Sequence, residues 1–159
     1  AINDCFKKDR PLIYFSPKGK PLNQDTIEKF SSTKGVSIIC GHFEGIDQRI
    51  IDLHDIEEIS IGDYILSGGE IATIVFLDSL VRLLPDVLGN NNSKKIESFT
   101  DGLLEYPQYT KPNEFKGMKI PDILLSGNHK AIKEWQENQA LSLTKLRRPD
   151  LIDKKKDKI

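Results

Sequence analysis

The sequence has few of the features that mark secreted, disulfide-stabilised or membrane proteins. It contains two cysteines, Cys5 and Cys40, without CxxC spacing, so we expect neither a disulfide nor a metal site. Cys40 lies in the apolar run VSIIC, where a thiol normally behaves as a small buried hydrophobe. No apolar run approaches the roughly 20 residues of a membrane-spanning helix, and the N-terminal residues AINDCFKKDR lack the apolar stretch of a signal peptide. These absences predict a cytoplasmic protein without a membrane partner.

The common phosphate-binding motifs are absent as well. Neither GxGxxG nor GxxxxGK followed by Ser or Thr occurs in the chain. The pair Gly68 and Gly69 precedes Glu70, whose negative charge would repel a phosphate group at the start of a helix. A pocket at this position therefore suits a neutral or cationic ligand better than a phosphorylated one.

Glycines are present where predicted strands end, at Gly41, Gly45 and Gly62 as well as before Glu70. Glycine lets backbone groups approach a ligand closely, and the carboxyl ends of parallel strands are a usual place for a ligand crevice. Each glycine taken singly is better explained as a simple chain turn. Together they indicate a cofactor pocket lined by backbone.

The charge is unevenly distributed along the chain. Residues 111–159 carry 12 Lys and Arg against 7 Asp and Glu, whereas residues 1–110 carry 11 against 17. A basic C-terminal part on an acidic body is typical of a polyanion-binding appendage, although a solvated basic face gives the same count. Charge alone leaves both interpretations open.

Strand and helix signals alternate in the first half of the chain, which predicts an α/β fold with a parallel sheet. Residues 12–15 and 36–40 are short apolar runs typical of buried strands, and residues 23–30 form a crossover helix capped by Asp25 or Thr26. Further apolar segments occupy residues 47–53 and 59–66. A helix apolar on most faces spans residues 70–84 and ends at Pro85.

The predicted domain organisation has three parts: an α/β domain over residues 1–88, a linker over 89–121 and a small helical domain over 122–159. The linker region has several prolines and no convincing hydrophobic period. In the last part Asn128 is positioned to cap a helix. The apolar stripe of this helix comprises Ile132, Trp135, Leu143 and Leu146.

Five longer motifs occur in a fixed order, namely CGHFEGIDQRI, SIGDYILSGGE, DGLLEYPQYTKP, LLSGNHKAIKEW and LRRPDL. In this order and spacing the sequence resembles the bacterial tRNA (guanine-N1) methyltransferases of the SPOUT class, from about residue 11 to about residue 152. The resemblance implies a parallel sheet tied into a deep trefoil knot, with a small helical C-terminal domain. It also implies a homodimer that uses S-adenosylmethionine, with Mg²⁺ as a supporting ion, to methylate N1 of a tRNA anticodon-loop guanine, 3′ of the anticodon.

Carried onto this sequence, the resemblance implies a cofactor pocket made largely of main-chain groups, with the adenine against Ile61, Tyr64 and Leu66. Singly, Tyr64 is also explained as a core aromatic and Glu44 as a helix N-terminal charge. The implied cofactor-binding residues are Tyr14, Phe15, Ser16, Pro17, Gly41, Glu44, Ser60, Ile61, Gly62, Asp63, Tyr64, Ile65, Leu66, Gly68 and Gly69.

Methyl transfer to guanine N1 needs a general base for the N1 proton and a cation for the charge that develops on O6. Arg82 matches the family's catalytic arginine, although an arginine on an apolar helix also occurs as a snorkelling surface residue. Glu97 stands where the family has its proposed base, an aspartate, and Asp101 is a second candidate. The extra methylene of glutamate displaces the carboxylate by about 1 Å, which can cost roughly a hundredfold in rate.

The basic C-terminal part supplies the implied tRNA contacts, which are Asn128, His129, Lys145, Arg147 and Arg148. Arg147 and Arg148 are suited to phosphate groups. Trp135 is better explained as a core residue. His42 and Phe43 stand where the family usually has Arg and Tyr, a departure that affects the substrate side more than the cofactor side.

The family's first strands and a glycine-rich loop precede the equivalent of Pro11, and we expect this segment to be missing. The main alternative to an enzyme is therefore a truncated module that binds S-adenosylmethionine or tRNA without catalysis. A nucleotide-dependent α/β protein is a third reading, which requires the glycines to bind phosphate.

Overall fold

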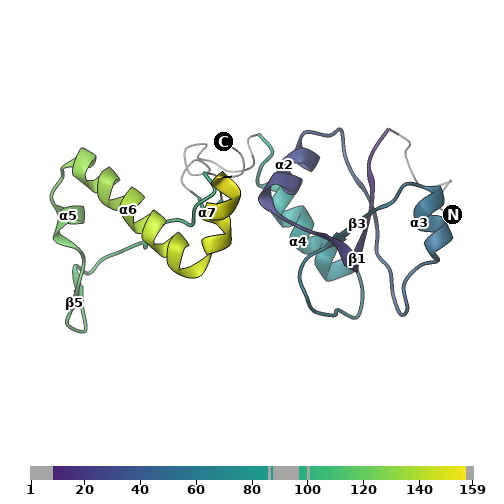
Figure 1. Ribbon diagram of the computed structural model, residues 1–159. Coiled ribbons are helices and arrows are strands. Elements are labelled where there is room, and N and C mark those ends of the chain that lie inside the picture. The colour runs from purple at the N-terminus through teal and green to yellow at the C-terminus, as the bar shows by residue number, and fades with distance from the viewer. Residues whose placement is uncertain (1–8, 86, 88–96, 100, 157–159) are drawn as a thin grey trace. The chain divides into compact units, whose positions relative to one another are not determined.

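The computed structural model describes residues 9–85, 87, 97–99 and 101–156 (Figure 1). The chain divides into two compact units, Ala1–Gly89 and Asn90–Ile159. In the described part of the chain, no helix is long and apolar enough to cross a membrane.

The first unit is built on a parallel three-stranded sheet. Its strands are β1 (Leu12–Pro21), β2 (Ser37–Ile39) and β3 (Glu57–Ser60), in the order β2-β1-β3. β1 occupies the centre because its first residues, LIYF, are apolar on both faces, as a strand covered on both sides requires. This arrangement confirms the predicted α/β class with a parallel sheet.

Helices cover both faces of the sheet (Figure 1). On one face, α2 (Gln24–Ser31) and α4 (Glu70–Val81) enclose a core that includes Ile13, Phe15, Ile27, Phe30, Ile59, Ala72 and Phe76. On the other face, α3 (Gln48–Leu53) covers a smaller cluster of Leu12, Tyr14, Ile51 and Ile56. Alternate residues of β1 therefore belong to different cores, as the two-residue period of a strand dictates.

β1 leaves β3 and returns to it within a few residues. Phe15 pairs with Ile59, and after a shift of register Lys20 pairs with Ile59 again. Gly19 allows this return, because a Cβ atom there would lie 2.5 Å from the backbone carbon of Glu58 and 2.6 Å from that of Ile59. Real Cβ atoms do not approach backbone atoms so closely. The close approach of β1 to β3 at this position therefore requires glycine.

Several local predictions need correction. The N-cap of α2 is Asn23, whose side chain accepts a hydrogen bond from the N–H of Thr26, and not Asp25 or Thr26. Cys40 is exposed rather than buried, because β2 ends at Ile39 and Cys40 already belongs to the loop that follows. The helix predicted to reach residue 84 ends at Val81, and residues 61–66 follow β3 as a loop.

The second unit contains a hairpin and three helices: β4 (Glu114–Phe115), β5 (Met118–Lys119), α5 (Asp122–Leu125), α6 (His129–Arg147) and α7 (Pro149–Lys156). The hairpin lies inside the stretch predicted as a linker.

The start of α6 is as predicted, because the Asn128 side chain accepts a hydrogen bond from the N–H of Ala131 at 3.2 Å. The predicted apolar stripe is only partly correct. Ile132, Trp135 and Leu143 are partly buried, whereas Leu146 is 80% exposed. The stripe therefore ends before the last turn of the helix.

Candidate functional site

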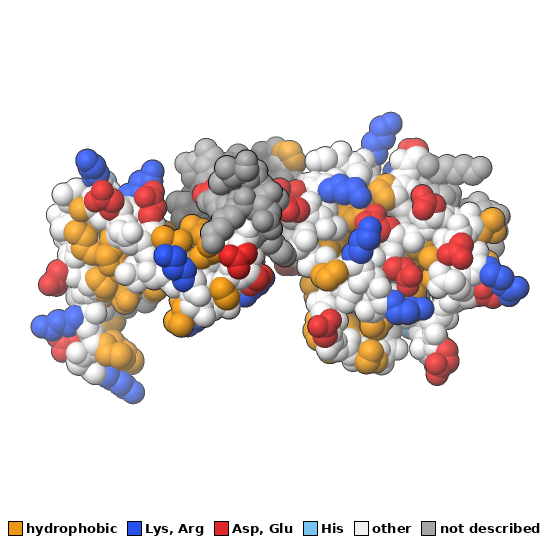
Figure 2. Space-filling view, in the orientation of Figure 1, with side chains coloured by type: hydrophobic (Ala, Val, Ile, Leu, Met, Phe, Trp, Pro, Cys, Tyr) orange, Lys and Arg blue, Asp and Glu red, His pale blue; other side chains and the backbone are white. Residues whose placement is uncertain are grey.

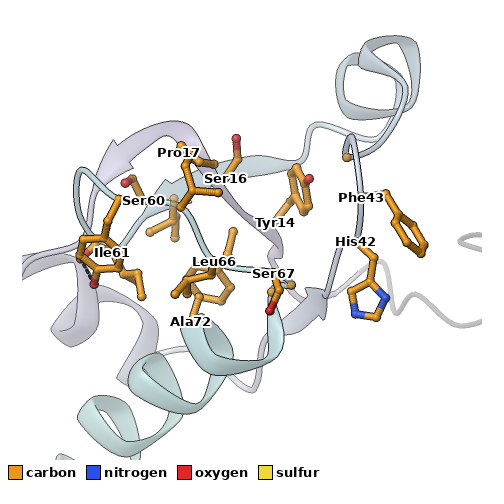
Figure 3. A pocket seen from close by; sticks show the side chains of 18 of the residues that line it. Tyr14, Ser16, Pro17, His42, Phe43, Ser60, Ile61, Leu66, Ser67 and Ala72 are labelled. Atoms are coloured by element: carbon orange, nitrogen blue, oxygen red, sulfur yellow. Dashed lines mark hydrogen bonds between the residues drawn. The ribbon is translucent and has the colours of Figure 1, made fainter.

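A pocket of about 250 Å³ lies at the carboxyl edge of the sheet (Figure 3). Three chain segments form it: residues 14–17 within β1, the loop that follows β2, and the stretch from the end of β3 to the start of α4. Its lining consists of Tyr14, Phe15, Ser16, Pro17, Gly41, His42, Phe43, Glu44, Gly45, Ile59, Ser60, Ile61, Gly62, Tyr64, Ile65, Leu66, Ser67, Gly68, Gly69 and Ala72.

The structure brings together all of the predicted cofactor residues except Asp63, which is not part of the lining. Gly45, one of the glycines that indicated the pocket, also lines it, whereas sequence reasoning did not assign His42, Phe43, Ile59, Ser67 or Ala72 to the cofactor. His42 and Ser67 are neighbours of predicted glycines, and this adjacency is the signal that could have found them. Ile59 and Ala72 belong to the core, and only the folded sheet shows that they reach the pocket.

Two loops far apart in sequence are joined at one side of the pocket. The N–H of Gly69 donates to the carbonyl oxygen of Gly41 at 3.0 Å, and Gly68 forms an antiparallel bridge with His42. The side chains of His42 and Glu70 form a hydrogen-bonded ion pair. The pKa of Glu70 is lowered, first because its carboxylate accepts its own backbone N–H and then because it accepts a hydrogen bond from His42.

Glycine is required at the points where these loops approach their neighbours. A Cβ atom on Gly41 would lie 2.6 Å from the ring of Tyr14, and one on Gly68 would lie 2.8 Å from the ring of His42. A side chain at either position would displace an aromatic ring of the lining. The glycines therefore do more than turn the chain, because they keep the pocket walls close together.

The polar groups of the pocket favour a ligand without negative charge. Among the described residues of the lining, none is Lys or Arg, and Glu44 contributes a carboxylate. The hydroxyl of Ser60 already donates to the carbonyl of Gly62 at 3.1 Å, and that of Tyr64 donates to the carbonyl of Ile61 at 3.2 Å. The lining therefore offers backbone groups, apolar contacts and one carboxylate, and no described Lys or Arg to pair with a phosphate.

The His42–Phe43 segment lies at the edge of the pocket, across from Ser60 and Ile61 (Figure 3). Phe43 is 100% exposed and has a backbone φ of 54°, which is uncommon for an aromatic residue. Its ring points away from the other labelled side chains. His42 and Phe43 are thus part of the rim, and their rings meet edge to face at 6.1 Å.

None of the three catalytic candidates is part of the pocket lining. Arg82 is the C-cap residue of α4, in the first unit. Glu97 and Asp101 belong to the second unit, in a turn that precedes the hairpin.

The predicted tRNA contacts fall into two groups, at opposite ends of α6. Asn128 caps the N-terminus beside His129, whereas Lys145 and Arg147 lie in the last turn. With a rise of about 1.5 Å per residue, the two ends of this helix are separated by roughly 25 Å. On the face shown in Figure 2 the basic side chains are likewise scattered over each unit.

Arg148 already has partners within its own unit. Its guanidinium donates two hydrogen bonds of 2.8 Å to the carboxylate of Asp150, which raise its pKa. It also lies 6.0 Å from the ring centre of Phe99. This arginine therefore contributes to the structure of the second unit, and its bidentate edge is occupied by a carboxylate.

Within the described residues, no group of three or more His, Cys, Asp or Glu side chains is arranged to hold a metal ion.

Comparison with known proteins decides the family. The model of the family described as tRNA (Guanine-1)-methyltransferase TrmD matches residues 1–154 of the chain. The chain belongs to this family. The match to the tRNA (guanine-1)-methyltransferases begins earlier than the five motifs indicated, since it includes the residues before Pro11.

Relatives with the name tRNA (guanine-N(1)-)-methyltransferase are more than half identical to the chain. That of Pelagibacter ubique is 54% identical over 156 residues, which are 98% of this chain and 68% of the relative. That of Bartonella tribocorum is 51% identical over 151 residues, 95% of this chain and 65% of the relative. That of Brucella canis is 55% identical over 148 residues, 93% of this chain and 61% of the relative. The chain thus spans roughly two thirds of the length of these relatives.

Proposed function

We propose that this chain transfers a methyl group from S-adenosylmethionine to N1 of a guanine in the tRNA anticodon loop, at the position 3′ of the anticodon. The observation that carries the proposal is the glycine-walled pocket at the carboxyl edge of the sheet, in a chain of this family. We place the reaction in the cytoplasm, in agreement with a tRNA substrate.

The pocket fits the chemistry of S-adenosylmethionine. The sulfonium and amino groups carry positive charge, which Glu44 complements, and the absence of Lys and Arg from the described lining avoids repulsion. Backbone groups of the loop from Ile61 to Leu66 hold the adenine. When bound, S-adenosylmethionine supplies the electrophilic methyl group.

The path of the chain around the pocket supports the proposal of a trefoil knot. The loop after β3 passes beyond the central strand β1 and reaches the loop after β2, where Gly69 bonds to Gly41. A trefoil knot requires in addition that the chain thread through a loop at this edge of the sheet. The knot itself is part of the proposal.

The residues proposed to act on the guanine come from both units. Glu97 or Asp101 accepts the N1 proton, and the guanidinium of Arg82 stabilises the negative charge that develops on O6. No described cluster fits Mg²⁺, so we assign this ion no site and no step.

The exposed face of α4 supports a homodimer. The helix is apolar on almost every side, yet Ile71 is 58% exposed and Ile74 is 60% exposed, with Val75 beside them. A helix that is hydrophobic all round is normally covered, and this face continues along the helix towards Arg82. A second copy of the chain on this face would bring Arg82 to the subunit interface.

Single-turnover methyl transfer to an anticodon-loop transcript tests the proposed activity. We expect Arg82→Ala and Glu97→Ala to lower the rate by about 10²- to 10⁴-fold, while Lys18→Ala, an exposed lysine on β1, leaves it unchanged. Unchanged rates in both active-site variants would contradict the assignment.

Analytical ultracentrifugation of Ile74→Glu tests the dimer, which this charge should dissociate.

The second candidate function is a non-catalytic module, because the chain spans only part of its relatives. Titration calorimetry separates the two functions. Cofactor binding together with methyl transfer supports the enzyme, whereas cofactor binding without any transfer supports the module.

A further inference from the structure

The turn that carries both candidate bases is folded mainly by its own backbone. In the described residues of this turn, 97–99 and 101–105, the N–H of Phe99 donates to the carbonyl of Leu103 at 2.7 Å, and the N–H of Gly102 donates to that of Phe99 at 3.1 Å. The hydroxyl of Ser98 accepts the N–H of Glu105 at 2.9 Å. We call residues 97–99 and 101–105 the acidic turn. These contacts give it a defined shape, but they do not attach it to a helix.

Thr144, on α6, supplies such an attachment. Its side chain is 0% exposed, and its hydroxyl accepts the N–H of Leu104 at 2.9 Å. The same hydroxyl donates to the carbonyl of Ala140 at 2.7 Å, which fixes its orientation. A buried hydroxyl that both donates and accepts a hydrogen bond is held in a single rotamer. The acidic turn is therefore attached to the helix at a defined point.

The acidic turn has a second contact with the end of α6, through Phe99. The guanidinium of Arg148 approaches the ring of Phe99, and Arg148 is itself held by Asp150. This contact is with a side chain near the tip of the turn, whereas Thr144 fixes the backbone at Leu104. The two contacts attach the acidic turn to consecutive turns of the helical C-terminal unit.

We propose that Thr144 is a positioning residue for the general base, acting through the Leu104 amide on the acidic turn that carries Glu97 and Asp101. The inference rests on the proposed function. Catalysis needs a base placed to within a fraction of an ångström of the proton that it removes. Thr144 does not touch the substrate; it sets where the carboxylate stands when the guanine arrives.

The test compares Thr144→Val, which keeps the shape of the side chain but loses the hydroxyl, with Thr144→Ser, which keeps the hydroxyl. We expect the valine variant to lower the single-turnover rate constant at saturating tRNA by about 10- to 100-fold. The half-saturating tRNA concentration and the S-adenosylmethionine dissociation constant should stay within about twofold of the wild type. Serine should restore the rate to within about threefold, and Ser142→Ala, which removes an exposed hydroxyl from the same helix, should have no effect.

Three outcomes overturn the inference. The first is an unchanged rate in Thr144→Val, and the second is a loss of tRNA or cofactor affinity as large as the loss of rate, which indicates a purely structural role. The third is failure of serine to restore the rate. If the valine variant does not fold, as judged by circular dichroism, Thr144→Ala, which removes the hydroxyl together with the γ-methyl of threonine and adds no new group, is measured in the same way. Absence of methyl transfer by the wild-type chain would instead refute the proposed function, and the inference with it.

Discussion

Substitution of Gly19 by alanine tests the close crossing of β1 and β3. The added Cβ atom would lie 2.5 Å from the backbone carbon of Glu58 and 2.6 Å from that of Ile59, where only backbone movement can make room. Such movement separates the strands at the second pairing of Ile59, with Lys20. It also strains the hydrogen bond of 2.7 Å between the Leu22 N–H and the Ser60 carbonyl.

The expected loss of stability follows from these contacts. Overpacking of a dense site costs about 1–3 kcal/mol, and each weakened backbone hydrogen bond adds about 1 kcal/mol. Alanine recovers roughly 0.5–1 kcal/mol by restricting the unfolded chain. We therefore expect Gly19→Ala to lower the free energy of unfolding of the first unit by about 2–4 kcal/mol.

Urea denaturation measures this loss. With an m-value of about 2 kcal/mol per M, the midpoint should fall by about 1–2 M. Because Trp135, the single tryptophan of the chain, lies on α6 in the second unit, circular dichroism should show the shift and tryptophan fluorescence should not. The control is Lys18→Ala, whose exposed side chain should change stability by less than about 0.5 kcal/mol. Equal midpoints for the wild type and Gly19→Ala would refute the reasoning from the crossing.

Two further predictions concern the His42–Glu70 pair and the cap of α6. Because the pKa of Glu70 is lowered from its ordinary value of 4.5, its contribution to stability is complete above that pH and is lost as pH falls through the lowered value. The urea midpoint of the wild type should therefore decline more steeply below pH 4.5 than that of Glu70→Gln, and equal slopes would count against the pair. Asn128→Ala should destabilise the second unit by about 1 kcal/mol in the Trp135 fluorescence transition. Asn138→Ala, at an exposed position within the same helix, should cause no loss, and equal effects would argue against the cap.

Sequence reasoning predicted the sheet and the pocket because both depend on signals that are local in the chain. The apolar run at residues 12–15 is the central strand, and the glycine-rich segment from Ser60 to Gly69 is one wall of the pocket. Glycine spacing and strand order are sufficient to bring such segments to one edge of a sheet. The roles given to these residues toward S-adenosylmethionine stay predictions.

The contacts that sequence reasoning missed depend on the exact path of the chain. Cys40 was expected in the core because its neighbours are apolar, but the strand ends one residue earlier. The His42–Glu70 pair joins residues 28 positions apart, and the Leu104–Thr144 hydrogen bond joins residues 40 apart. No local pattern indicates such a pairing. A threonine within a predicted helix is usually interpreted only in terms of its helix propensity.

Because the hydrogen bond between Gly69 and Gly41 joins distant parts of the chain, the pocket can form only after a long stretch of the protein has been synthesised. The walls of the pocket extend in sequence from Tyr14 to Ala72, so no shorter nascent chain contains the complete site. Parallel strands joined by long crossovers pair slowly, because distant parts of the chain must meet first. A ligand therefore stabilises this unit only after Ala72 has left the ribosome, and until then the early strands remain available to chaperones and to wrong partners.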